Sequence, residues 1–235
     1  MMLGLIALTA APGLAIAIYV YWRDKFERDP FFLLLTCFLL WAFSILPAIA
    51  DEALLDRAFH FDGAVELWKA AVNSFIFIAL IEEGVKFVCL RVFIFNRKEF
   101  NGPYNGITYA VMISMGFATI ENFFYVFSGD DFGGWGTAFL RAFTAVPAHA
   151  ANAVMMGYFV GIAKMNEKHR TLLSITGLVV ATFFHGAYDF FLTQRALPGI
   201  TGGAFIALIV AVILSRRAIN IHKRYNYIQH IKAGN

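Results

Sequence analysis

The sequence predicts an all-α fold, a polytopic membrane bundle of about seven transmembrane helices. Of its 235 residues, 60% are hydrophobic and only 15% are charged, a balance that a water-soluble domain of this size does not carry. Apolar stretches of about 20 residues, the length that crosses a bilayer as a helix, recur along the chain. The predicted spans are roughly 3–22, 31–50, 70–95, 105–127, 137–163, 171–193 and 199–215.

The chain is expected to form a single integral membrane domain over residues 1–235, with a motif-bearing core at about 70–192. No internal repeat, low-complexity segment or long linker divides the sequence. The first span, 3–22, has no basic segment before it and leads directly into a basic loop, so we expect a retained anchor and not a cleaved signal peptide.

The distribution of basic residues predicts the topology. Fourteen Lys and Arg residues fall in the odd-numbered connections and the C-terminal tail. Four fall on the other side, namely Arg57, Lys69, Arg141 and Arg195. By the positive-inside rule we expect a multi-pass protein of the cell membrane with its N-terminus outside and its C-terminus in the cytoplasm.

The C-terminal tail and the two cysteines are not expected to take part in a reaction. The basic and aromatic tail from His222 to His230 is typical of a segment that fixes topology and contacts anionic lipid, so the lipid bilayer is the expected partner and nucleic acid is not. Cys37, in the second span, and Cys89, in the third, offer neither a disulfide framework nor a C-x-x-C pair, so we expect packing roles.

The third span carries the most informative group of residues. Glu82 and Glu83 stand with Lys86 in an apolar run, where an unpaired ionisable residue costs roughly 2.5 to 3.5 kcal/mol at a helix centre. Glu82 and Lys86 are four residues apart and share a face, whereas Glu83 is rotated by about 100°. The structural alternative is a packed ion pair, but one lysine balances only one of the two carboxylates.

The fourth and fifth spans add further polar groups. Phe117 precedes Glu121 by one turn, with Asn122 beside it, although Glu121 could also be a hydrated residue at the membrane interface. In the fifth span His149 is followed one turn later by Asn152. Pro147, two residues before His149, is expected to kink this helix and make room for water or a metal ion.

The sixth span contains His185 and Asp189, which share one helical face. An aspartate in this position can orient an imidazole and set its tautomer; the alternative is an ion pair that closes a helix contact. With a rise of 1.5 Å per residue, Glu82, Glu121, His149 and His185 all lie about 21 to 24 Å from the cytoplasmic ends of their spans. They are therefore expected to form one layer in the outer half of the bilayer.

Such a layer can hydrolyse a substrate in two ways. A glutamate can act as general base on a water while a histidine stabilises the oxyanion. Alternatively, histidines and a glutamate can hold Zn²⁺ and leave a second glutamate as base. The sequence has no H-E-x-x-H motif, so it leaves the metal open; its candidate ligands are Glu82, Glu121, His149 and His185.

Taken in order, the motifs E-E-x-x-K at 82–86, F-x-x-x-E-N at 117–122, the His149 segment and H-x-x-x-D at 185–189 resemble the PrsW family of intramembrane proteases, which is related to the CAAX-protease and bacteriocin-processing membrane enzymes. The resemblance implies a peptidase that cleaves a membrane-tethered substrate, such as a single-span anti-sigma factor in a stress response, on its extracytoplasmic side. It also implies that Glu82 or Glu83 is the base and that His185 and Asp189 lie opposite. The related enzymes carry histidine where this chain has Glu121, so His149 is expected to supply that imidazole.

The catalytic candidates are therefore Glu82, Glu83, Glu121, His149, His185 and Asp189, and the candidates for orienting the substrate are Lys86, Asn122 and Asn152. Two other classes of function also fit polar groups in spans. A proton- or ion-coupled transporter uses carboxylate and histidine relays, but usually shows two matched halves, and we find no such self-similarity. A non-catalytic sensor or scaffold would keep the groups as structural ion pairs.

Overall fold

The computed structural model of the chain describes residues 1–23, 29–46, 66–128 and 133–232. Its elements within these ranges are all helical, which confirms the predicted all-α class. They are α1 (Met2–Arg23), α2 (Phe31–Ala42), α4 (Leu67–Val72), the π-helical segment η1 (Asn73–Ala79), α5 (Leu80–Val88), the π-helical segment η2 (Cys89–Ile94), α6 (Pro103–Phe127), α7 (Gly133–Phe143), α8 (Ala145–Met165), α9 (Arg170–Thr193), the 3₁₀ turn η3 (Pro198–Ile200) and α10 (Gly203–Lys232).

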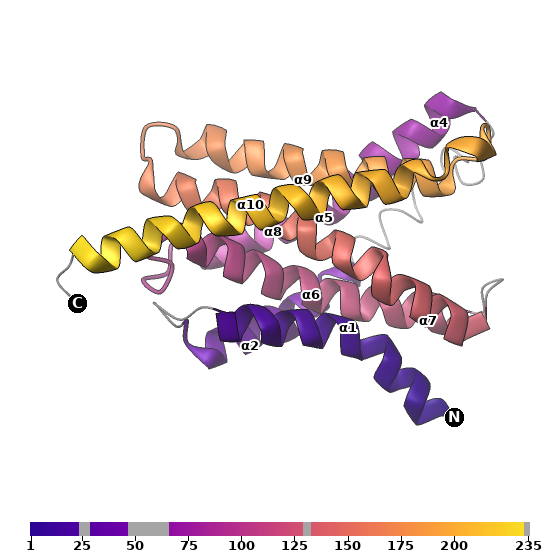
Figure 1. Ribbon diagram of the computed structural model, residues 1–235, viewed down its shortest axis with the longest axis horizontal. Coiled ribbons are helices and arrows are strands. Elements are labelled where there is room, and N and C mark those ends of the chain that lie inside the picture. Colours follow the sequence, from indigo (N-terminus) through magenta and orange to yellow (C-terminus); the bar gives the residue numbers. More distant parts are fainter. Residues whose placement is uncertain (24–28, 47–65, 129–132, 233–235) are drawn as a thin grey trace.

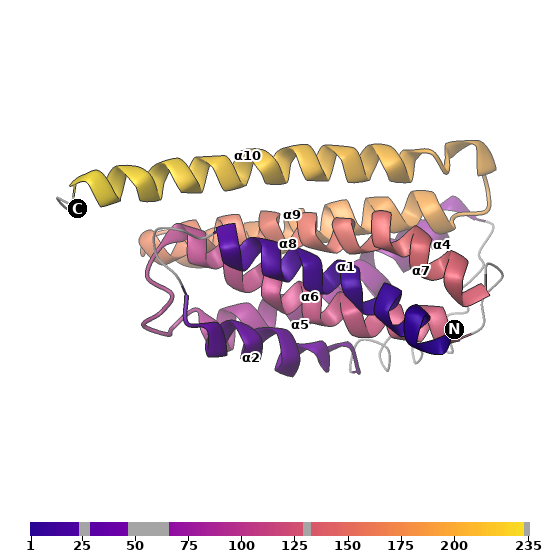
Figure 2. The same cartoon turned by 60° about the horizontal axis from the view of Figure 1, so that its bottom comes forward.

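The long helices run along the longest axis of the molecule (Figure 1). In the turned view, α10 lies along one side and α2 along the opposite side, with α6 and α8 between them (Figure 2). The start of α1 and the end of α10 lie at opposite ends of the bundle (Figure 1). Opposite ends are what an odd number of membrane crossings produces.

Helix α6 is the centre of the bundle and is buried along nearly its whole length. It packs closely on α8 because small residues face each other at the crossing: a β-carbon added to Gly106 or to Gly157 would collide with the backbone of the other helix. Helix pairs in membranes use small residues in this way, since the backbones must approach closely for dispersion contacts to form. The crossing fixes the spacing between the polar residues farther along both helices.

Five helices among the described residues are long and apolar enough to cross a membrane, so the predicted number of seven spans is not confirmed. They are Met2–Trp22, Pro103–Phe127, Gly134–Met165, Arg170–Thr193 and Pro198–Arg224. The predicted span 31–50 begins as α2, and its last four residues lie outside the described ranges. The predicted span 70–95 is helical from α4 to η2. It is not one of the five, because its charged residues lie close together in the middle of the apolar stretch.

Pro147 interrupts the predicted span 137–163, as expected, but the break lies one turn before it, so that Pro147 itself is in the first turn of α8. A proline ring clashes with the carbonyl four residues before it, here that of Phe143, the last residue of α7. The chain leaves helical geometry at Thr144, with φ −123° and ψ −76°, and α8 then begins at Ala145. Pro147 thus separates α7 from α8 and places His149 in the second turn of α8.

Candidate active site

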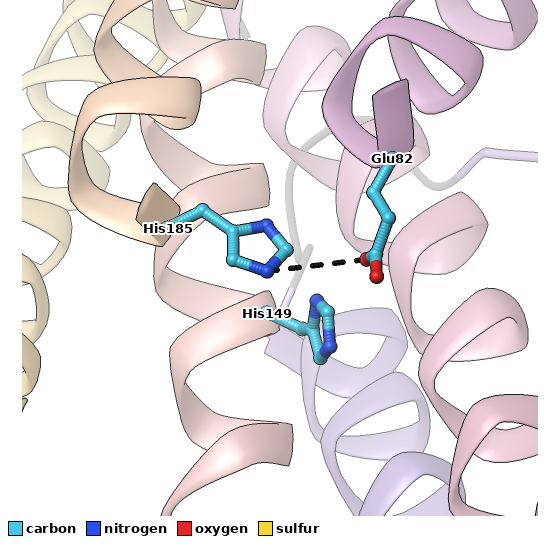
Figure 3. A group of neighbouring side chains, drawn as sticks. All are labelled: Glu82, His149 and His185. Carbon is cyan, nitrogen blue, oxygen red and sulfur yellow. Dashed lines mark ion pairs between the residues drawn. The ribbon is translucent and has the colours of Figure 1, made fainter. Parts of the chain in front are cut away.

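Three of the predicted residues meet inside the bundle. Glu82 of α5, His149 of α8 and His185 of α9 each offer one ligand atom, and these atoms all lie within 4.8 Å of one another. The three side chains point toward a common centre (Figure 3). Their residues are only 4–5% exposed, although they come from three helices far apart in sequence. Charged and polar groups at this depth require partners, which the neighbouring helices supply.

Lys86 joins the two adjacent glutamates. Its ammonium lies 3.2 Å from Glu82 Oε2 and 2.9 Å from Glu83 Oε1, so it contacts both carboxylates rather than pairing with Glu82 alone. Its third contact is His149 Nδ1 at 3.2 Å, and the ring of Phe117 lies 4.1 Å away. Each of the three ammonium hydrogens therefore has an acceptor.

The contacts of His149 define its tautomer. An ammonium group can only donate, so Nδ1 accepts a hydrogen bond from Lys86. The proton of the ring must then be on Nε2, which donates to Glu121 Oε2 at 2.8 Å. Glu121 thus holds the far side of the imidazole, as second-shell carboxylates do for metal-binding histidines.

His185 is held between carboxylates on both sides. Its Nδ1 lies 2.9 Å from Glu83 Oε1, and its Nε2 lies 3.2 Å from Asp189 Oδ2 and 4.0 Å from Glu82 Oε2. The predicted His185 and Asp189 pair is thus in contact. Glu83 occupies for His185 the place that Glu121 occupies for His149.

Arg141 belongs to this network, although the sequence interpretation used it only to predict topology. Its guanidinium lies 2.6 Å from Glu121 Oε2, and its Nε donates to Asn122 Oδ1 at 2.7 Å. It also lies 4.1 Å from the ring centroid of Tyr125. Glu121 is 8% exposed and therefore not a hydrated interface residue. The sequence did contain a signal for this pair. One predicted span holds a single arginine, and the span before it holds a glutamate without a partner.

The three predicted orienting residues differ in how fully their polar atoms are used. Lys86 is saturated, and Asn122 accepts from Arg141 and donates to the carbonyl of Thr9 at 3.4 Å. Asn152 is different, because its Nδ2 is buried and has no hydrogen-bond partner among the described residues. Glu83 Oε2 shares this property.

A cavity of about 230 Å³ opens beside the three converging residues. Its polar lining includes Glu82, Glu121, His149, Asn152, His185 and Asp189. Glu83 and Lys86 do not line it, so they face the back of the site. Most of the rest of the lining is apolar and comes from α7, α8, α9 and α10. The arrangement provides a cavity inside the bundle that is lined by acids and imidazoles together with apolar side chains.

The donor set fits a divalent metal ion. Two imidazoles and one carboxylate with an open position are a known zinc combination, and here the rear nitrogen of each imidazole is held by a further carboxylate. The site has four carboxylates, those of Glu82, Glu83, Glu121 and Asp189, and two cationic side chains, those of Lys86 and Arg141. With neutral imidazoles the formal charge is therefore −2, which a divalent cation balances.

Comparisons with known proteins agree on one family. The sequence model described as "PrsW family intramembrane metalloprotease" matches residues 29–216. A "Protease PrsW" of Geobacillus kaustophilus is 33% identical over 205 residues, 87% of each chain. Those of Bacillus subtilis and Clostridioides difficile are 31% and 33% identical, over 82% and 99% of this chain and 84% and 94% of their own. No solved structure matches the chain.

Proposed function

The chain belongs to the PrsW family of intramembrane proteases, as its motifs predicted, and from this premise we propose that it hydrolyses a peptide bond at the site of Glu82, His149 and His185. It is a multi-pass membrane peptidase. The observation that carries the proposal is the convergence of these three ligand atoms within 4.8 Å, on the wall of a cavity inside the bundle. Membership of a protease family favours hydrolysis over the transport alternative.

In this proposal Glu82, His149 and His185 hold a Zn²⁺ ion. When bound, the ion would make a water molecule more acidic and polarise the substrate carbonyl. Glu121 and Glu83 hold the two imidazoles from behind, at 2.8 Å from His149 Nε2 and 2.9 Å from His185 Nδ1. They act as positioning residues, because each contacts the reaction only through a histidine.

Asp189 is the proposed proton acceptor. It lines the cavity, and its Oδ2 lies 3.2 Å from His185 Nε2, the nitrogen that would bind the ion in place of this contact. Glu83 does not line the cavity, and Glu82 belongs to the proposed metal ligands. One proton of the attacking water passes to Asp189 Oδ2 as the water oxygen bonds to the carbonyl carbon. When the carbon–nitrogen bond breaks, the same proton passes to the leaving amine.

The proposed substrate is a membrane-tethered protein, such as a single-span anti-sigma factor, cut on or near the extracytoplasmic side. Glu121 and His185 lie in the second halves of α6 and α9, and His149 lies near the start of α8. That end of the bundle is also where α1 begins (Figure 1). With the N-terminus outside, as the positive-inside rule predicts, the site lies in the outer half of the bilayer.

The test is cleavage of single-span substrates by the purified protein in liposomes, with bound zinc measured in the same samples. Glu82→Gln and His149→Ala should lose both zinc and cleavage, because each removes a ligand. Asp189→Asn should keep zinc but lose cleavage about 100-fold or more, the scale of a general base. Full activity of zinc-free wild type, or of Glu82→Gln, would contradict the proposal.

A further inference from the structure

Asn152 has an unused hydrogen-bond donor inside the bundle. The residue is 2% exposed, and its Nδ2 has no acceptor among the described residues. An unpaired buried polar group of this kind is destabilising, so its presence in a packed core calls for a compensating role. A ligand that brings its own acceptor would supply one.

The position of Asn152 indicates which ligand this is. It follows His149 by three residues on α8, so the two side chains share a helical face. Both line the same cavity, together with Glu82 and His185. A ligand that enters this cavity therefore lies beside the side chain of Asn152 as well as the catalytic groups. Because Nδ2 is itself shielded, the amide turns toward the ligand to donate.

The buried amides of Asn122 and Asn105, by contrast, have partners on both of their polar atoms. Asn122 uses its oxygen for Arg141 and its nitrogen for the carbonyl of Thr9. Asn105 uses its nitrogen for Asp29, at 3.0 Å, and its oxygen for backbone N–H groups. Both amides hold helices in place, whereas that of Asn152 contributes no such contact.

We propose that Asn152 Nδ2 donates a hydrogen bond to the carbonyl oxygen of the scissile peptide, and that this bond strengthens as the oxygen becomes an oxyanion. The proposal rests on the hydrolytic function proposed above. Attack of water on the carbonyl carbon moves an electron pair onto that oxygen, and a hydrogen-bond donor directed at it stabilises the developing charge. Asn152 is then a catalytic residue, because its amide touches the reacting group.

The test compares Asn152→Leu with Ser74→Ala. Leucine has nearly the shape of asparagine without the donor, and Ser74 is a matched control because its Oγ is also buried and unpartnered but does not line the cavity. We expect Asn152→Leu to lower kcat about 100- to 1000-fold, as removal of an oxyanion donor does elsewhere. Bound zinc and KM should stay near the wild-type values. The unfolding temperature should equal or exceed that of the wild-type protein. Ser74→Ala should cleave like wild type.

Three outcomes would overturn the proposal: a kcat within threefold of wild type, a raised KM with unchanged kcat, or a fall in unfolding temperature that accounts for the lost activity. Asn152→Ala, which cannot clash, answers the same questions if the leucine variant does not fold. Failure of the underlying function gives a different pattern, since Glu82→Gln would then cleave like wild type whatever happens at residue 152.

Discussion

At the scale of single residues, Lys86 and a zinc ion would compete for the same ligand atoms. Its ammonium contacts Glu82 Oε2 and His149 Nδ1, which are atoms that a zinc ion would also need. The lysine is thus the cation that holds two carboxylates and one imidazole together. Zinc binding must displace it from Glu82 and His149, while its contact with Glu83 Oε1 at 2.9 Å can remain.

We therefore predict that Lys86→Met increases zinc affinity at least tenfold, because it removes a competitor and makes the site more negative. The metal-free variant should be less stable by about 3 to 5 kcal/mol, the cost of leaving buried charges without their partner. Zinc affinity can be measured by competition with a chromophoric chelator, and stability by thermal unfolding with and without zinc. Lys69→Met is the control, since Lys69 pairs with a half-exposed Glu66 away from the site. Unchanged or weaker zinc binding would contradict the competition.

The sequence predicted the contacts that lie within one helix better than those between helices. Glu82 with Lys86, and His185 with Asp189, follow from four-residue spacing alone. Which of the two adjacent glutamates lines the cavity depends on how α5 is rotated against its neighbours, and the spacing carries no such information. The contact of Arg141 with Glu121 was missed for the same reason, because it joins two helices.

At the scale of elements, the close crossing of α6 and α8 sets the distance between Glu121 and His149. The two side chains meet at 2.8 Å, and the crossing is possible because Gly106 and Gly157 have no side chains. Membrane helices can be predicted from apolar length, but such a crossing depends on which small residues face each other. The sequence therefore predicted the helices that carry the site, and the crossing decided how they meet.

We predict that Gly157→Ala pushes α6 and α8 apart. The new β-carbon would lie 2.7 Å from the Cα of Ile107 and closer still to the carbonyl oxygen of Gly106, neither of which can move as a flexible side chain would. Overpacking of this kind costs about 1 to 3 kcal/mol. We expect a lower unfolding temperature together with weaker zinc binding and slower cleavage, because His149 moves away from Glu121, which holds its imidazole in position.

Gly84→Ala is the matched control for this prediction. A β-carbon at Gly84, on α5, meets no atom within 4 Å, and alanine is the better helix former by about 1 kcal/mol. This variant should be as stable as wild type or more so and should keep its zinc. If Gly157→Ala behaves in the same way, the crossing does not set the geometry of the site.

At the scale of the whole molecule, the position of the site along the bundle follows from the ends of the chain. The start of α1 and the end of α10 lie at opposite ends (Figure 1). The site residues of α6, α8 and α9 lie in the halves of these helices that are nearer the start of α1. The side of the membrane on which a substrate is cut therefore depends on the orientation of the N-terminus. The excess of basic residues in the other set of connections predicts that this end is outside.

Labelling of single cysteines in intact cells tests this orientation. Ser128, which follows α6, and Lys168, in the turn between α8 and α9, are both exposed and lie at opposite ends of the bundle. We expect a membrane-impermeant maleimide to label Ser128→Cys in intact cells and Lys168→Cys only after the cells are opened. The native Cys37 and Cys89 are 0% and 2% exposed and should give little background, which the unsubstituted protein measures. The reverse pattern would place the site in the cytoplasmic half of the bilayer, and a substrate cut on its extracytoplasmic side would then be incompatible with this bundle.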